Sequence, residues 1–169
     1  RNNKNEITES PTQLFERVAV LITIGDLLHD SSIFNQAGNT PQNIEEAKEY
    51  LTKLDQFNYK FKIDEYYLNQ YHFRGLVNGY IDIAQKGQAK ISFKDLLTKL
   101  AAKEFTDYGA RITEYFDLMV NQVFLPNSPT MMNAGGRLGQ LSACFVLGMP
   151  DDMGKIMKTT YDAALDRKE

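Results

Sequence analysis

Apolar residues recur at helical spacing through most of the first 122 residues. The clearest run predicts a helix from Pro11 to Leu28. Ser10 is a suitable N-cap for this helix, and Gln13 completes a capping box. The residues that share its apolar face are Leu14, Val18, Leu21 and Gly25. The pattern therefore places an amphipathic helix near the start of the sequence.

A second helix is predicted to open at Thr40-Pro41. Residues 62–87 come next and are ambiguous, because their tyrosines suit either a strand or a helix. Their apolar spacing loosely favours a helix with breaks near Gly75 and Gly79.

Two further helices are clearer. Ser92 caps the first, with Asp95 three residues later, and the second begins after Thr106 and continues to Asn121. Together these segments predict a mainly α N-terminal domain over residues 1–122.

The pattern changes at Phe124. LPNSPT carries two prolines and an Asn-Ser pair, which exclude a helix there, and NAGGRLG is a glycine-rich connection. QLSACFVLG is almost wholly apolar, as a strand buried on both faces is. A last helix follows, with Asp151 as its N-cap and an apolar side made of Met153, Ile156, Met157, Thr160 and Ala164. Residues 123–169 thus predict one loop–strand–helix unit, whose single strand needs neighbours from a larger domain.

Composition and charge exclude several classes of function. The net charge of −3, without a basic stripe, argues against a nucleic-acid partner. No apolar run approaches the roughly 20 residues of a membrane helix, and RNNKNEITES lacks the apolar centre of a signal peptide. The single cysteine cannot form an internal disulfide, which fits a reducing cytoplasm.

Few side chains indicate chemistry by their type alone. His29 and His72 lie in different segments without spaced carboxylates or thiols, so no metal site is expected. The hydroxyls and backbone donors of residues 127–130 suit phosphate oxygens, although a plain turn fits the composition better. Two interpretations of Cys144 stay open: an inert buried thiol, or half of a redox couple.

The order of residues in the C-terminal third adds a family resemblance. FLPNSPTMMNAGGRLGQLSACFVLGMPDDM closely resembles the start of the catalytic barrel in the large subunit of ribonucleotide reductases, most of all the adenosylcobalamin-dependent class II enzymes. Weaker similarity lies in NEITESPTQLFERVA, FDLMVNQVFLPNSP and YDAAL. The resemblance implies a helical N-terminal domain at 1–122, followed at 123–169 by the first loop–strand–helix unit of the reductase α/β barrel.

The same resemblance implies roles for individual residues. These enzymes reduce ribonucleotides to deoxyribonucleotides by radical chemistry, and Cys144 matches one half of their redox-active cysteine pair, with its partner beyond this chain. The positions that match substrate contacts are Ser128, Ala143 and Cys144. The positions that match the binding region for a deoxynucleoside triphosphate effector are Asp151, Asp152 and Met153. Asp152 stands where the family usually has Ser, which adds a negative charge beside an anionic ligand.

Cofactor and partners follow from the resemblance as well. It implies adenosylcobalamin, with contacts outside this chain, a ribonucleoside di- or triphosphate substrate, and a thioredoxin-like or other dithiol reductant. It also implies a homodimer formed through the C-terminal helix and a cytoplasmic location. The thiyl-radical cysteine and the acid–base Asn and Glu lie beyond residue 169, so the chain alone is expected to be inactive.

Two alternatives stay open at this point. The chain could be a non-catalytic helical binding or regulatory module that retains a reductase-like segment. It could also come from an oxygen-dependent reductase with a di-iron partner, because the first redox cysteine is shared across the classes. Continuation of the reading frame into further Cys, Asn and Glu residues would favour a reductase over the binding module.

Overall fold

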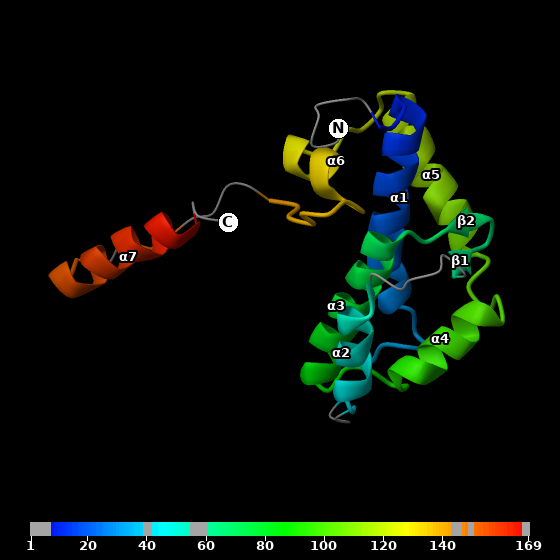
Figure 1. Cartoon of the computed structure of the whole chain (residues 1–169), viewed down its shortest axis with the longest axis horizontal. Helices are drawn as coiled ribbons and strands as arrows, with labels where there is room; N and C mark the ends of the chain where they lie inside the picture. Colours follow the sequence, from blue (N-terminus) through cyan, green and yellow to red (C-terminus); the bar gives the residue numbers. More distant parts are fainter. Residues whose placement is uncertain (1–7, 39–41, 55–60, 143–146, 149–150, 167–169) are drawn as a thin grey trace.

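The computed structural model describes residues 8–38, 42–54, 61–142, 147–148 and 151–166. Helices dominate these ranges, as the hydrophobic pattern predicts: α1 (Pro11–Leu28), α2 (Glu45–Thr52), α3 (Gln70–Gln85), α4 (Phe93–Ala101), α5 (Tyr108–Val120), α6 (Ser128–Asn133) and α7 (Met153–Asp166) (Figure 1). Within the described part of the chain, the strands are the two-residue β1 (Lys62–Ile63) and β2 (Tyr66–Tyr67), paired antiparallel with Ile63 opposite Tyr66. None of the described helices is both long and apolar enough to cross a membrane.

Helix α1 begins and ends where the sequence predicts. The Ser10 hydroxyl accepts a hydrogen bond from the Gln13 amide at 3.2 Å, and the Gln13 side chain accepts one from the Ser10 amide at 2.8 Å. This capping box satisfies two amide donors that would otherwise be unpaired at the helix start. The predicted cap of α4 is also confirmed, because the Ser92 hydroxyl accepts from the Asp95 amide at 3.1 Å.

The core forms around α1, which packs against α3 on one side and α5 on the other (Figure 1). An aromatic cluster joins α2, α3 and α4, with Phe73 5.8 Å from Tyr50 and Phe93 5.0 Å from Tyr80 between ring centroids. Across from it, the Tyr115 and Tyr108 hydroxyls of α5 donate to Asp26 and Asp30 at 2.6 and 2.8 Å. Burial of Ile112 and Met119 of α5 in the core and these two hydrogen bonds therefore hold α5 against α1 and the turn that follows it.

The predicted breaks at Gly75 and Gly79 are wrong, because α3 runs unbroken from Gln70 to Gln85. Each glycine lies instead where α1 comes close. A Cβ at Gly75 would lie 2.7 Å from Leu21 Cδ1, and one at Gly79 would lie 2.5 Å from Leu28 Cδ1. These glycines leave room for α1. Of the tyrosines that made the segment ambiguous, Tyr66 and Tyr67 lie in β2, whereas Tyr71 and Tyr80 lie within α3.

The exclusion of helix from LPNSPT is also wrong, since α6 begins at Ser128. Asn127 is its N-cap, and its Oδ1 accepts the Thr130 amide at 3.1 Å. Pro129 sits in the first turn, where a missing amide donor costs nothing because that donor has no helical partner anyway. The two prolines mark a helix start here, not a continuous loop.

The other C-terminal predictions fare differently. The last helix is confirmed, but its cap is Asp152 instead of Asp151, because Asp152 Oδ1 accepts the Lys155 amide at 2.9 Å. The predicted strand is not seen at residues 140–142, and residues 143–146 of it lie outside the described ranges. Thr40-Pro41 lies outside them too, and the described α2 starts at Glu45.

His72 is a polar side chain buried at the start of α3, with 3% of its surface exposed. Its Nδ1 accepts the Asn69 amide at 3.2 Å, and its Nε2 donates to the Arg17 carbonyl oxygen of α1 at 2.9 Å. That pair of bonds requires the neutral ring. Burial lowers the pKa of His72 from 6.5 to about 4, so the ring is neutral throughout the physiological range.

This lowered pKa predicts a pH-dependent loss of stability. As pH falls from 6.5 toward about 4, the unfolded chain takes up a proton at His72 that the folded chain does not. The free energy of unfolding should therefore fall across that window, by about 3 kcal/mol in total, and this contribution should level off at lower pH. Urea unfolding at a series of pH values measures it.

The carboxylates of the chain also titrate in this range, so the His72→Gln variant is the control. Its own stability will be lower, but the slope against pH should be shallower than that of the parent chain between pH 6.5 and about 4. Parallel slopes in the two proteins would contradict the assignment.

Candidate functional site

The structure describes only part of the predicted site. Ser128 is the first residue of α6 and is exposed to solvent. Asp151, Asp152 and Met153 are exposed at the start of α7, which lies apart from α6 and the other helices (Figure 1). Ala143 and Cys144 lie outside the described residues. The described ranges therefore test neither the redox role of Cys144 nor the effector site, and both stay predictions.

The end of α6 and the segment that follows it are held by side chains from the helical domain. Arg17 of α1 donates to the carbonyl oxygens of Met131 and Ala134, the first of these at 3.3 Å. Asn69 Nδ2 donates to the Gly135 carbonyl at 3.1 Å.

Arg74 of α3 completes the set. One of its terminal nitrogens donates to the carbonyl oxygens of Gly136 at 3.1 Å and of Arg137 at 2.7 Å. We call Arg17, Asn69 and Arg74 the carbonyl clamp. Together these three side chains bind five backbone carbonyls between residues 131 and 137.

Gly135 lies where the clamp is tightest. Its φ of +64° is in the left-handed region, and a Cβ there would collide with His72 and Arg17. Glycine is therefore required on both conformational and steric grounds. The glycine-rich connection predicted from the sequence thus approaches α1 and α3 at this residue.

The far end of the segment is tied to α6 itself. The Thr130 hydroxyl donates to the Leu141 carbonyl at 3.0 Å, and Asn133 Nδ2 donates to the Gln140 carbonyl at 2.8 Å. These bonds turn the chain back toward α6 just before residue 143. The path leading up to Cys144 is therefore set by α6, and the place of α6 is set by the clamp.

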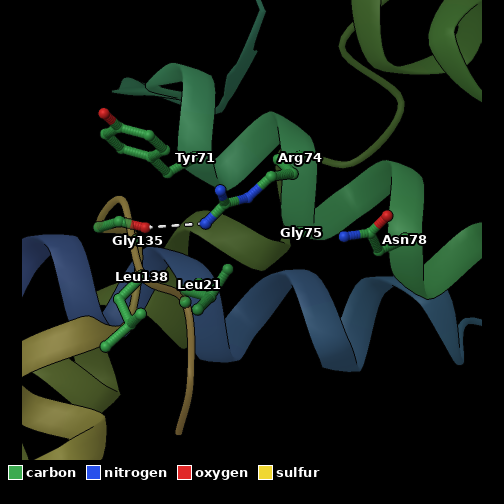
Figure 2. A pocket seen from close by; sticks show the side chains of 9 residues that line it. Leu21, Tyr71, Arg74, Gly75, Asn78, Gly135 and Leu138 are labelled. Carbon is green, nitrogen blue, oxygen red and sulfur yellow. Dashed lines mark hydrogen bonds between the residues drawn. The ribbon is translucent and has the colours of Figure 1, made fainter. Parts of the chain in front are cut away.

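A cavity of about 280 Å³ lies behind the segment. Leu21, Tyr71, Arg74, Gly75 and Asn78 line it from α1 and α3, and four residues of the segment close the other side: Gly135, Gly136, Leu138 and Gly139. Figure 2 shows Arg74 reaching from α3 to the glycine backbone, with Leu21 and Leu138 nearby. The segment thus passes over the surface of α1 and α3 and leaves a cavity between them.

The two arginines of the clamp differ in their electrostatic surroundings. Arg17 forms an ion pair with Glu9 at 2.8 Å, and its hydrogen bonds hold the pKa of Glu9 below the usual value. Arg74 has no ion pair with any carboxylate in the described part of the chain, and its guanidinium lies 5.3 Å from the centre of the Tyr71 ring. In the described structure its guanidinium contacts carbonyl oxygens and the face of this ring.

The side chains around the segment after α6 do not form a metal or cobalamin site. Among them, no group of three or more His, Cys, Asp and Glu side chains could hold a metal ion. Both ring nitrogens of His72 are already hydrogen-bonded, so this histidine is not free to ligate cobalt. The cavity of about 280 Å³ falls below the range for even a drug-sized ligand, and a corrinoid is larger still.

Comparison with known proteins identifies relatives of one kind. Residues 88–139, which include α4, α5, α6 and most of the clamped segment, match the family described as "Ribonucleotide reductase, all-alpha domain". The chain is 32% identical over 169 residues to the "Vitamin B12-dependent ribonucleoside-diphosphate reductase" of Thermoplasma acidophilum, covering 99% of this chain and 19% of that protein. No solved structure matches.

Shorter matches point the same way. A Mycobacterium tuberculosis protein with the same name is 51% identical over 47 residues, which is 28% of this chain and 7% of that protein. The "Ribonucleoside-diphosphate reductase subunit alpha" of Bacillus subtilis is 44% identical over 46 residues, 27% of this chain and 7% of that protein. The chain spans about a fifth of the length of the Thermoplasma relative, whose similarity extends over almost all of this chain. It is therefore homologous to the N-terminal part of the ribonucleotide reductase large subunit, including that subunit's all-alpha domain.

Proposed function

We propose that this chain is the N-terminal part of a B12-dependent reductase that converts ribonucleotides to deoxyribonucleotides for DNA precursor synthesis. The observation that carries the proposal is the 32% identity, along 99% of the chain, to a protein named as a vitamin B12-dependent ribonucleoside-diphosphate reductase. Ribonucleoside diphosphates are accordingly the favoured substrate class. By itself the chain is inactive, because the radical-carrying cysteine and the acid–base residues belong to the remainder of the enzyme.

Cys144 supplies one of the two thiols that act as the immediate reductant. Replacing the ribose 2′-hydroxyl by hydrogen requires two electrons and two protons, and the hydroxyl leaves as water. Two cysteine thiols provide these electrons and protons and become a disulfide. A dithiol of the thioredoxin type then reduces the disulfide by thiol–disulfide exchange. This role explains a lone cysteine in an apolar run, since its partner is part of the same enzyme but not of this chain.

Ser128 has the role of a substrate contact. It is exposed at the start of α6, where a hydroxyl can donate to a phosphate or ribose oxygen without entering the chemistry. The Ala143 and Cys144 backbone contributes to the same binding site. The helical domain helps to hold Ser128 in place through the carbonyl clamp, which binds the carbonyl oxygens at the end of α6.

Helix α7 is the proposed homodimer contact, with the deoxynucleoside triphosphate effector bound near its start. Four large side chains recur every four residues along the helix and are 45–69% exposed: Met153, Met157, Tyr161 and Leu165. Such a stripe suits a second copy of the same helix. Asp152 caps the helix, so part of its charge is balanced by backbone amides and by the positive end of the helix dipole. That engagement lessens the conflict between Asp152 and an anionic effector.

Replacing Cys144 by Ser in the enzyme that contains this chain should abolish repeated turnover with a dithiol reductant, because no disulfide can form. Substrate affinity should stay close to that of the parent enzyme, since serine keeps the size of the side chain. Product formation over many turnovers and equilibrium nucleotide binding measure the two effects. Sustained turnover would reduce Cys144 to core packing and favour a non-catalytic helical module.

Replacing Ser128 by Ala should raise the substrate KM by about fivefold, the value of one hydrogen bond, and should change kcat much less. Ser31→Ala is the matched control, because Ser31 is an exposed serine in the loop after α1, far from α6. Steady-state kinetics of both variants decide the assignment. An unchanged KM for Ser128→Ala would remove Ser128 from the substrate site.

Replacing Met157 by Glu should shift this chain from dimer toward monomer, because it puts a charge in the middle of the apolar stripe. The adjacent Lys158→Glu substitution changes charge on the same helix outside the stripe and should leave the dimer intact. Sedimentation velocity at increasing concentration distinguishes the two. A parent chain that is monomeric at every concentration would contradict the α7 interface.

A further inference from the structure

The segment after α6 owes its position to polar bonds more than to packing. It has no regular secondary structure between Ala134 and Gly139, and a cavity of about 280 Å³ separates much of it from α1 and α3. Leu138 is 60% exposed, so its side chain does not anchor the segment in the core. Apolar burial in this stretch is confined to Ala134 and the glycine beside it. Hydrogen bonds must therefore supply most of the restraint.

The carbonyl clamp provides that restraint from rigid elements. Arg17 lies in the second turn of α1, Asn69 is the N-cap of α3, and Arg74 lies in the second turn of α3. The clamp spans five backbone carbonyls, and its first acceptor, Met131, is only three residues from Ser128. A shift of the Met131 and Ala134 carbonyls therefore moves α6 and Ser128 relative to the helical domain, and the bonds at residues 135–137 restrain the chain that directly follows.

We infer that Arg17, Asn69 and Arg74 are positioning residues that set the place of Ser128 for substrate binding, without touching substrate themselves. The inference rests on the function proposed above, because it needs Ser128 to be a substrate contact. Its physical basis is that a donor held even a small distance from its productive position loses most of its hydrogen bond to the ligand.

Asn69 allows positioning to be separated from folding. Its Oδ1 accepts the Tyr71 and His72 amides at 2.9 and 2.8 Å and so caps α3, whereas its Nδ2 donates to Gly135. Asn69→Asp keeps the capping oxygen, since Asp caps helices as well as Asn does. It loses the donor to the loop and puts a carboxylate oxygen against the Gly135 carbonyl. The substitution thus opens the clamp while retaining the helix cap.

Asn43 offers the matched control. Its Oδ1 accepts the Glu45 amide at 3.0 Å just before α2, and no hydrogen bond from its amide nitrogen is seen in the described structure. Asn43→Asp therefore makes the same chemical change with no donor bond to lose. Arg17 is unsuitable for this test, because it also pairs with Glu9 and its side chain is only 13% exposed.

The test measures KM, kcat and amide exchange in the enzyme that contains this chain. Asn69→Asp should raise the substrate KM about fivefold with little change in kcat, and should speed exchange of the Ala134 and Gly136 amides. Arg74→Met should act in the same direction, and Arg74→Lys, which can still reach one carbonyl, should recover part of the effect. Asn43→Asp should leave KM and exchange unchanged. Thermal unfolding checks that every variant folds.

A double-mutant cycle links the clamp to Ser128. If the clamp acts through Ser128, adding Asn69→Asp to Ser128→Ala should raise KM little further. Faster exchange in Asn69→Asp with an unchanged KM would overturn the inference, and so would unchanged exchange. If Ser128→Ala leaves KM unchanged while Asn69→Asp raises it, the role proposed for Ser128 fails, whereas the clamp still positions another group of the loop.

Discussion

The close approach of α1 and α3 is the contact on which the rest of the structure depends. Gly75 and Gly79 favour it, because a Cβ at either position would force the end of the Leu21 or Leu28 side chain of α1 to move. At the same contact, His72 of α3 donates to the Arg17 carbonyl of α1. The side chains that hold the segment after α6 extend from these same two helices. Packing between α1 and α3 therefore also determines the geometry at Ser128.

Local chemistry made much of the helical domain predictable. The capping box at Ser10 and the cap at Ser92 depend only on residues within three positions of each other. Prediction from neighbouring residues fails where one residue type can either interrupt a helix or be accommodated in it. Glycine has a low helix propensity, but Gly75 lies inside α3 where α1 comes close. Proline disrupts the interior of a helix but is tolerated in the first turn, where Pro129 lies. Only the neighbouring helix, or the cap at Asn127, distinguishes these cases.

The carbonyl clamp could not be predicted from the sequence. Its donors are separated from their acceptors by 117, 66 and 62 positions at Arg17, Asn69 and Arg74 respectively. The acceptors are backbone oxygens, which every residue carries, so no pairing of side-chain types marks them. Gly135 was the one residue type in the sequence that suggested a close contact. That its missing Cβ leaves room for His72 and Arg17 is known only from the fold. The family resemblance, in contrast, rested on residue order and needed no contacts at all.

Recognition through backbone oxygens leaves the side chains of the clamped segment unconstrained by the clamp. Arg74 binds the Arg137 carbonyl and not its side chain, which is exposed, whereas Leu138 also lines the cavity behind the segment. Position 137 can consequently change without disturbing the clamp, and its side chain is available to contact any structure that lies against this face. The main-chain path of the segment is therefore fixed by the clamp, while the outer side chain at position 137 can vary.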